Sequence, residues 1–245
     1  MPSLVPPPLT DADIHQRLID AVLDHRLQPG TKLVEDTLGQ AFGVSRTRIR
    51  QVLIRLAQEQ IVTLIPNRGA TIAVPTVADA REVFEARRLI EPALVQHCVA
   101  RLTTADLQAL ARNIRDEEAA RQRGDREAEI RHSGAFHLLL ADRAGHTTLG
   151  RMLHGLVSRT SLVLMTFGPQ PAAPLPTTRG ARPLCNCDDH RALLAALKLR
   201  DANAASALMT AHLQHIEDGL VLAPQAPQEA SLLTVLTRTP PPRAA

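Results

Sequence analysis

Aromatic side chains are scarce in this sequence. Tryptophan and tyrosine are absent, and phenylalanine occurs only at Phe42, Phe84, Phe136 and Phe167. Proteins that bind single-stranded nucleic acid stack the bases on aromatic rings, so this scarcity argues against that class. Recognition of double-stranded DNA through its grooves depends on other side chains and is not excluded.

Cysteines, long apolar runs and a secretory leader are also lacking. Three cysteines in 245 residues do not make a disulfide scaffold, which indicates a reducing compartment. No run of about 18 apolar residues occurs, so no membrane span is expected. The N-terminal segment MPSLVPPPLT has neither a basic region nor an apolar core, so it does not resemble a signal peptide. We therefore expect a cytoplasmic protein without membrane association.

What is present is typical of a folded chain with two domains. Hydrophobic residues make up 44% and charged residues 22% of the sequence, and the length suits two modest domains. Both ends are rich in proline, as is an internal stretch that cannot be helical. The expected organisation is a flexible tail over 1–9, a first domain over 10–75, a second domain over 76–222 with a long loop over 168–187, and a tail over 223–245.

The first domain has the pattern of three helices followed by a β-hairpin. Asp11 or Asp13 can cap a first helix that runs to about His25, and a short helix over 35–42 stops at Gly43. Ser45 is a good N-cap for a third helix over 46–59. Two β-rich runs over 61–65 and 70–74 flank the turn sequence PNRG.

The second domain has helical periodicity almost throughout, so the chain as a whole is expected to be mainly α. Gly124 and Gly145 occupy positions where helices often end, and Asp201 can cap the last helix. The expected helices span 79–100, 104–123, 126–143, 147–166, 188–200 and 202–221.

The third helix of the first domain has the features of a DNA-reading helix. Its apolar stripe contains Ile49, Val52, Leu53 and Leu56, so the opposite face is expected to point outward. In a helix-turn-helix the first turns of the second helix reach base edges in the major groove. The residues expected there are Ser45, Arg46, Thr47, Arg48, Arg50 and Gln51.

The hairpin that follows would act as a wing, with Arg68 and Gly69 at its tip. Glycine permits a close backbone approach, and arginine can enter a minor groove or bind phosphate. Residues 43–70 contain five arginines and one glutamate, a local charge of +4, although the whole chain carries only +3. The basic charge is therefore concentrated in this one helix and its wing. A solvated face is the alternative explanation for such a cluster.

Three segments resemble the winged helix of GntR-family transcriptional regulators: LQPGTKL at 27–33, GVSRTRIRQVL at 43–53 and PNRG at 66–69. The family pattern reads PGxxL, GVSRTPVREAL and PNRG. The sequence departs from it at Arg48, where proline is usual, and at Gln51, where glutamate is usual. The resemblance implies that Arg46, Thr47 and Arg50, together with Gly69, contact double-stranded operator DNA.

The second domain resembles the FCD effector domain of the FadR subfamily. This resemblance implies an all-α bundle that forms a homodimer, often holds a metal ion, and responds to a small organic acid or related metabolite. Repression is the usual mode of action in the family. The stretches that carry the resemblance are 85–92, 136–137, 189–197 and 209–212.

Three histidines are expected to point inward from three helices of this domain. His137 lies on the apolar stripe of its helix, His190 shares a face with Leu194, and His212 shares a face with Leu208. A single inward histidine is more often a hydrogen-bonded core residue. Three of them at positions that match the ligand pattern of the family favour a divalent metal site, since imidazole is a common metal ligand.

The expected metal site lacks one usual ligand. The family places a carboxylate four residues before the histidine of the Phe-His pair, and this sequence has Ser133 there. Cys187 could compensate, because cysteine and histidine together suit zinc. The alternative is that Cys185 and Cys187 are ordinary loop cysteines. Zinc is the first choice of ion, with nickel and manganese as alternatives.

Arg87 lies on an apolar stripe, where a guanidinium needs an anionic partner. That partner is either Glu91, one turn further on, or the carboxylate of a bound effector. His215 lies at the edge of the buried face of the last helix. Arg87, Ser133 and His215 are thus the candidate effector-binding residues.

Three functions are compatible with these patterns. The first is a ligand-responsive transcriptional regulator rather than an enzyme. The second is a metal-dependent hydrolase that uses the histidine cluster, although the sequence contains neither an HExxH spacing nor a nucleophile elbow. The third is an architectural DNA-binding protein without an effector.

Overall fold

The computed structural model describes residues 9–66, 69–169 and 186–222. The chain divides into two compact units between Val74 and Pro75, and each unit is described by itself. Both units are mainly helical, as the sequence predicted, and the first also contains a small antiparallel sheet. None of the described helices combines the length and the apolar composition that crossing a membrane requires.

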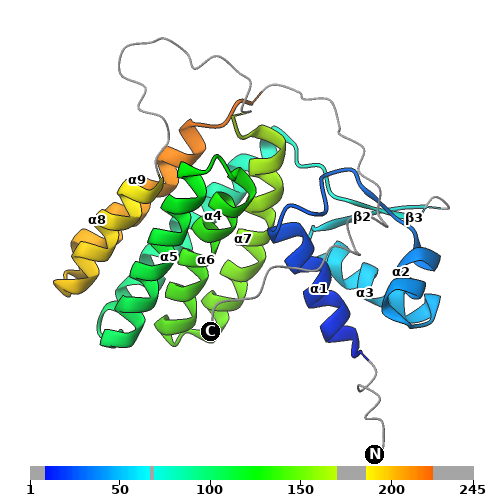
Figure 1. Ribbon diagram of the computed structural model, residues 1–245, viewed down its shortest axis with the longest axis horizontal. Coiled ribbons are helices and arrows are strands. Elements are labelled where there is room, and N and C mark those ends of the chain that lie inside the picture. Colours follow the sequence, from blue (N-terminus) through cyan, green and yellow to red (C-terminus); the bar gives the residue numbers. More distant parts are fainter. Residues whose placement is uncertain (1–8, 67–68, 170–185, 223–245) are drawn as a thin grey trace, which may run out of the picture. The chain divides into compact units, whose positions relative to one another are not determined.

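The described residues of the first unit form three helices and three short strands (Figure 1). The strand order is β1-β3-β2, with Thr71 of the central strand paired to both Lys32 and Thr63. Its elements are α1 (Asp11–Leu23), β1 (Lys32–Leu33), α2 (Glu35–Phe42), α3 (Arg46–Gln58), β2 (Val62–Ile65) and β3 (Gly69–Ile72).

Two local predictions for this unit need correction, and one strand was not predicted. The N-cap of α1 is Thr10, because its hydroxyl accepts a hydrogen bond from the Asp13 amide while the Asp13 carboxylate accepts one from the Thr10 amide. The helix ends at Leu23, since His25 adopts a left-handed conformation with φ of 56°. The strand β1 was not expected, because a two-residue strand leaves no periodicity to detect.

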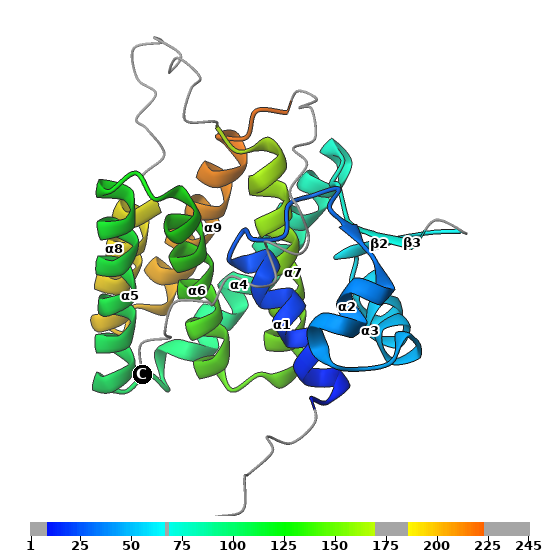
Figure 2. The same ribbon diagram turned by 45° about the vertical axis from the view of Figure 1, so that its right-hand side comes forward.

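The second unit is a bundle of six described helices that run roughly alongside one another (Figures 1 and 2). Thr76, Thr103 and Asp201 cap the first, second and last of them, and Gly145 ends the third in a left-handed conformation. The helices are α4 (Val77–Val99), α5 (Thr104–Gln122), α6 (Arg126–Ala144), α7 (Thr147–Phe167), α8 (Asn186–Lys198) and α9 (Ala202–Asp218).

Part of the core of the bundle is formed by apolar side chains of α4, α7 and α9. Phe84, Val163 and Ile216 are buried together there. Burial of this kind stabilises the bundle by about 25 cal/mol per Å² of apolar surface and fixes which helical faces point inward. The loop predicted for 168–187 and both tails fall largely on residues outside the described ranges.

Candidate functional site

The recognition helix α3 is positioned by a tight turn after α2. Gly43 ends α2 with φ of 66°, and the Ser45 hydroxyl accepts a hydrogen bond from the Arg48 amide at 3.5 Å. Gly39 has no room for a side chain, because a Cβ there would lie 2.9 Å from the carbonyl oxygen of Val44. The turn therefore depends on small residues that let the two helices approach closely.

The inward and outward faces of α3 are those that its periodicity predicted. Ile49, Val52, Leu53 and Leu56 are buried against the rest of the unit. The side chains of Arg46, Thr47, Arg50 and Gln51 are exposed, which leaves them accessible to a ligand.

Two of the outward arginines are held by acidic residues of α2. Arg50 donates two hydrogen bonds of 2.8 Å to the carboxylate of Glu35. Arg46 lies 3.0 Å from Asp36, measured from Nε to Oδ1. The hydrogen bonds from Arg50 lower the pKa of Glu35, so this carboxylate is ionised at neutral pH. A planar bidentate pair of this kind fixes the direction of the Arg50 guanidinium.

Arg48 occupies the position where the GntR family pattern has proline, and it contacts α1 rather than α2. Its guanidinium donates to the Asp11 carboxylate at 2.7 Å and to the Leu9 carbonyl oxygen at 2.7 Å. Arg48 thus ties the first turn of α3 to the start of α1. At the wing, Gly69 is exposed with φ of 89°, whereas Arg68 lies outside the described residues.

The second cluster is formed by three buried histidines of the helical unit. His137 on α6, His190 on α8 and His212 on α9 each offer a ring nitrogen, and these nitrogens lie within 4.8 Å of one another. Their exposed fractions are at most 1%. Residues 75 positions apart in the sequence are thereby brought together, with the Nε2 atoms of His137 and His212 at 3.2 Å.

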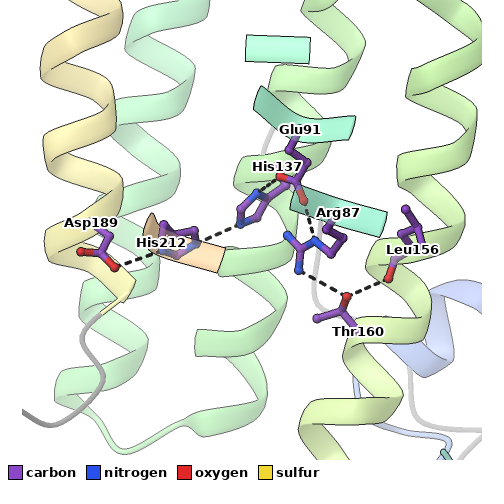
Figure 3. Close-up of polar contacts among 7 residues, drawn as sticks. All are labelled: Arg87, Glu91, His137, Leu156, Thr160, Asp189 and His212. Atoms are coloured by element: carbon purple, nitrogen blue, oxygen red, sulfur yellow. Dashed lines mark hydrogen bonds and ion pairs between the residues drawn. The ribbon is translucent and has the colours of Figure 1, made fainter. Parts of the chain in front are cut away.

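A carboxylate holds the other ring nitrogen of each histidine. The Nδ1 atom of His137 donates to Glu91 at 2.5 Å, that of His190 to Glu117 at 2.7 Å, and that of His212 to Asp189 at 3.2 Å. Figure 3 shows two of these pairs, with Glu91 and Asp189 at opposite ends of the His137–His212 contact. An ionised carboxylate only accepts hydrogen bonds, so when these three carboxylates are ionised each Nδ1 carries the proton and each Nε2 carries a lone pair.

Burial keeps His137 and His190 neutral. Burial lowers the pKa of His137 to about 3 and that of His190 well below its ordinary value. Burial also raises the pKa of Glu117 to about 7. The hydrogen bond from His212 lowers the pKa of Asp189 to about 2. Neutral imidazole is the form that binds metals.

These residues fit a divalent cation. Two Nε2 lone pairs that face each other at 3.2 Å repel unless a proton or a cation lies between them. The Nε2 atom of His190 is buried and has no hydrogen-bond partner among the described residues. Around a bound metal ion, a histidine commonly binds the ion through one ring nitrogen while its other ring nitrogen donates a hydrogen bond to a carboxylate.

Arg87 joins this cluster to the neighbouring helix α7. Its Nε donates to Glu91 at 2.5 Å and its NH1 group to the Thr160 hydroxyl at 3.3 Å, as Figure 3 shows. Burial by itself raises the pKa of Glu91. The attraction of Arg87 and the contact with His137 outweigh burial and lower this pKa to about 2. The NH2 group of Arg87 is buried and lacks a hydrogen-bond partner among the described residues.

The other predicted site residues lie around the cluster. Ser133 is buried one turn before His137 on α6, and the exposed His215 lies 3.1 Å from Asp189, between Nδ1 and Oδ2. Cys187 is buried in the first turn of α8, but it does not belong to the group of three nitrogens. Cys185 lies outside the described residues.

The sequence analysis missed two of the three carboxylates that hold the histidines. Asp189 directly precedes His190 in the sequence, so its closeness to the histidine cluster could have been predicted. Glu117 shares the buried face of α5 with Leu110 and Ile114, at spacings of 3 and 7 residues. An acidic residue on an apolar stripe is a signal for a buried partner.

The fold and these two clusters define a DNA-binding protein in which a winged helix-turn-helix is joined to a helical domain. Comparison with known families agrees with this class. Residues 10–72 match the model described as "Bacterial regulatory proteins, gntR family", and residues 82–215 match the FCD domain. The chain belongs to the GntR family of transcriptional regulators and carries an FCD domain.

Individual relatives support the same assignment. The chain is 24% identical to the regulator YdfH of Escherichia coli O6:H1, over 89% of this chain and 91% of that protein. It is 25% identical to the transcriptional repressor RspR of Escherichia coli K12, over 79% and 81%. The structure of Escherichia coli McbR/YncC superposes with a TM-score of 0.70 at 23% identity, over 83% and 93%. These relatives are transcriptional regulators and not enzymes, so the hydrolase alternative has no support.

Proposed function

We propose that the protein is a homodimeric repressor of the FadR subfamily whose affinity for a palindromic operator is adjusted by a metabolite and a divalent metal ion. It would act in the cytoplasm, bound to the nucleoid when it occupies DNA. The observation that carries the DNA-binding part is the row of exposed arginine and threonine side chains on the first turns of α3. The name of the relative RspR supports repression rather than activation.

On the DNA, each side chain of the row has a distinct expected role. Arg46 and Arg50 would exchange their acidic partners on α2 for base edges or phosphates, and the methyl group of Thr47 would contact thymine. Gln51 would contribute on the same face. Gly69 and Arg68 of the wing would approach the DNA backbone. Ser45 would act through the helix cap and Arg48 through its contacts with α1.

The proposed metal site rests on three imidazole rings whose nitrogen atoms lie close together. A carboxylate at the Nδ1 atom fixes the orientation of each ring. His137, His190 and His212 would hold the ion, with zinc as the first choice and nickel or manganese as alternatives. When bound, the ion would supply positive charge and open coordination positions for a ligand. Cys187, which is buried in the first turn of α8, is the candidate for a further ligand.

The effector is proposed to be a small organic acid or a related metabolite. The NH2 group of Arg87, which lacks a hydrogen-bond partner among the described residues, suits a carboxylate, and Ser133 offers a hydroxyl one turn before His137. His215 could act through Asp189, which it contacts at 3.1 Å. An effector that binds two arrangements of the bundle with different affinities would shift the balance between them, and with it the affinity for DNA.

A titration of labelled upstream DNA tests the DNA-binding part. We expect Arg46→Ala and Arg50→Ala to weaken specific binding, each by about 1–3 kcal/mol, if the side chain reads a base. Thr63→Ala on β2 is a control for an exposed substitution in the same unit. Unchanged affinity and sequence preference in both arginine variants would refute the assignment of α3 as the reading helix.

Metal analysis tests the second part. We expect the purified protein to retain a divalent ion that chelation removes, and His137→Ala or His190→Ala to abolish retention. Thermal unfolding with and without small organic acids then tests the effector. Absence of bound metal, together with unchanged stability in both histidine variants, would contradict a metal site and favour the architectural alternative.

A further inference from the structure

Glu117 is a buried carboxylate that lacks a full set of partners. It lies on α5 with an exposed fraction of 0%, and its Oε2 atom accepts the hydrogen bond from Nδ1 of His190 at 2.7 Å. Its Oε1 atom has no hydrogen-bond partner among the described residues. By contrast, both oxygens of Glu91 are used, one by Arg87 and one by His137.

The charges around the three histidines do not balance within the described protein. Glu91, Glu117 and Asp189 each contact a histidine of the cluster, whereas only Arg87 brings a positive charge into the same network. The side chain of Asp189 is 30% exposed and also contacts His215, whereas Glu91 and Glu117 are buried. Arg87 compensates Glu91, so Glu117 is the buried carboxylate of this network that has no buried cation beside it among the described residues. An uncompensated buried carboxylate is costly, and a cation bound at the histidines would compensate it through His190.

Other cations do not replace that ion. His132 also acts on Glu117, but burial lowers its pKa and so favours its neutral form. Arg121 and Arg191 act on Glu117 from a distance, but both side chains are exposed to solvent. Arg191 is moreover paired with Glu118 at 2.8 Å and with Asp188 at 3.0 Å. Solvent screens exposed charges, so these arginines compensate a buried carboxylate poorly.

We propose that Glu117 is a positioning residue that supplies, through His190, the negative charge that a direct carboxylate ligand would otherwise bring to the metal ion. Ser133 occupies the position of that ligand, one turn before His137, and contributes no charge. A carboxylate that accepts the Nδ1 proton fixes the tautomer of His190 and raises the basicity of Nε2. The inference rests on the proposed metal site and assigns the source of its counter-charge.

The decisive variant is Glu117→Gln, because the amide oxygen can still accept the hydrogen bond from His190 while the charge is lost. Its affinity for Zn²⁺, measured by competition with a chromophoric chelator, is expected to fall about 10- to 100-fold. Glu118→Gln is the matched control, since it removes a carboxylate from the next position of α5 without touching a histidine of the cluster. Its affinity for Zn²⁺ is expected to stay within about twofold of wild type.

A second pair of measurements separates a role in metal binding from a role in folding. Without metal, Glu117→Gln is expected to unfold at or above the wild-type temperature, because it removes an uncompensated buried charge. Its gain in stability with saturating Zn²⁺ is expected to be smaller than that of wild type. The double variant Ser133→Asp/Glu117→Gln is expected to recover much of the lost affinity, since it returns one negative charge beside the ion.

The outcomes distinguish the inference from the site on which it rests. A wild-type protein that binds no Zn²⁺ overturns both. A wild-type protein that binds Zn²⁺ as tightly as Glu117→Gln overturns the role of Glu117 and leaves the metal site standing. Should Glu117→Gln fail to fold, Glu117→Asp is measured instead, because its shorter side chain keeps the charge but withdraws it from Nδ1 of His190; its affinity for Zn²⁺ is expected to fall, and wild-type affinity would overturn the role of Glu117. A folded double variant that binds Zn²⁺ at least about 100-fold more weakly than Glu118→Gln would contradict the exchange of one carboxylate for the other.

Discussion

Replacing Arg87 with methionine removes the guanidinium that the described residues contribute to the buried polar network. Arg87 and Glu91 have side-chain exposures of 2% and 1%, and their Nε and Oε1 atoms lie 2.5 Å apart. After the substitution, Glu91 keeps its contact with His137 but has lost the cation that compensates its charge. Removing one partner of a buried ion pair costs about 3–5 kcal/mol, because the other charge stays buried.

That free energy converts to a large shift of the unfolding temperature. The helical unit spans Pro75–Gln225, a size for which 1 kcal/mol shifts Tm by about 2–4 °C. We therefore expect Arg87→Met to lower the Tm of this unit by about 6–20 °C. Differential scanning calorimetry in the presence of a chelator measures the shift without a contribution from bound metal.

Two further variants make the reasoning testable. Arg88→Met breaks the neighbouring pair with Glu217, which is partly exposed at 24% and 16%, and is expected to cost no more than about 1 kcal/mol. Arg87→Met/Glu91→Gln removes both charges and is expected to recover most of the loss. If Arg87→Met unfolds within about 1 kcal/mol of wild type, the network does not depend on this ion pair.

Three other predictions concern the DNA-binding unit. Gly39→Ala is expected to destabilise the DNA-binding unit by about 1–3 kcal/mol, measured by urea unfolding, because the added methyl group meets the carbonyl oxygen of Val44. A variant as stable as wild type would show that the turn can relax. Ser45→Ala is expected to cost about 1 kcal/mol through loss of the helix cap, whereas Ser45→Asp should retain stability. Glu35→Gln is expected to strengthen binding to unrelated DNA, because Arg50 loses its ion pair with Glu35 and can contact phosphate. Fluorescence anisotropy at several salt concentrations measures this affinity, and weaker binding to all sequences would contradict the prediction.

Periodicity and end signals in the sequence predicted most of the fold. The inward faces of α3 and α6 follow from the spacing of their apolar residues, and Gly43, Ser45 and Asp201 mark helix ends where the structure has them. The start of α1 was assigned to the wrong residue because Thr10, Asp11 and Asp13 all have side chains that can cap. Distinguishing them requires the backbone geometry, which composition does not supply.

The candidate site was only partly predictable for a physical reason. Spacing along one helix shows that a histidine points inward, but not which side chain of another helix meets its second nitrogen. Glu117 and His190 are 73 residues apart, and their contact depends on how α5 and α8 pack. Arg87 and Glu91 were predictable as a pair because both lie on α4, one turn apart.

The contacts of Arg46 and Arg50 also bear on how operator recognition would achieve selectivity. A phosphate or a base must compete with Glu35 and Asp36 for each guanidinium, so part of the gain from binding DNA is offset by the loss of an existing ion pair. Since phosphates are the same in every sequence, this offset weakens binding to all DNA alike. An equal loss leaves the ratio of specific to non-specific affinity unchanged. It does keep the non-specific complex, which has phosphate contacts alone, weak at a protein concentration at which the added base contacts still hold the specific complex.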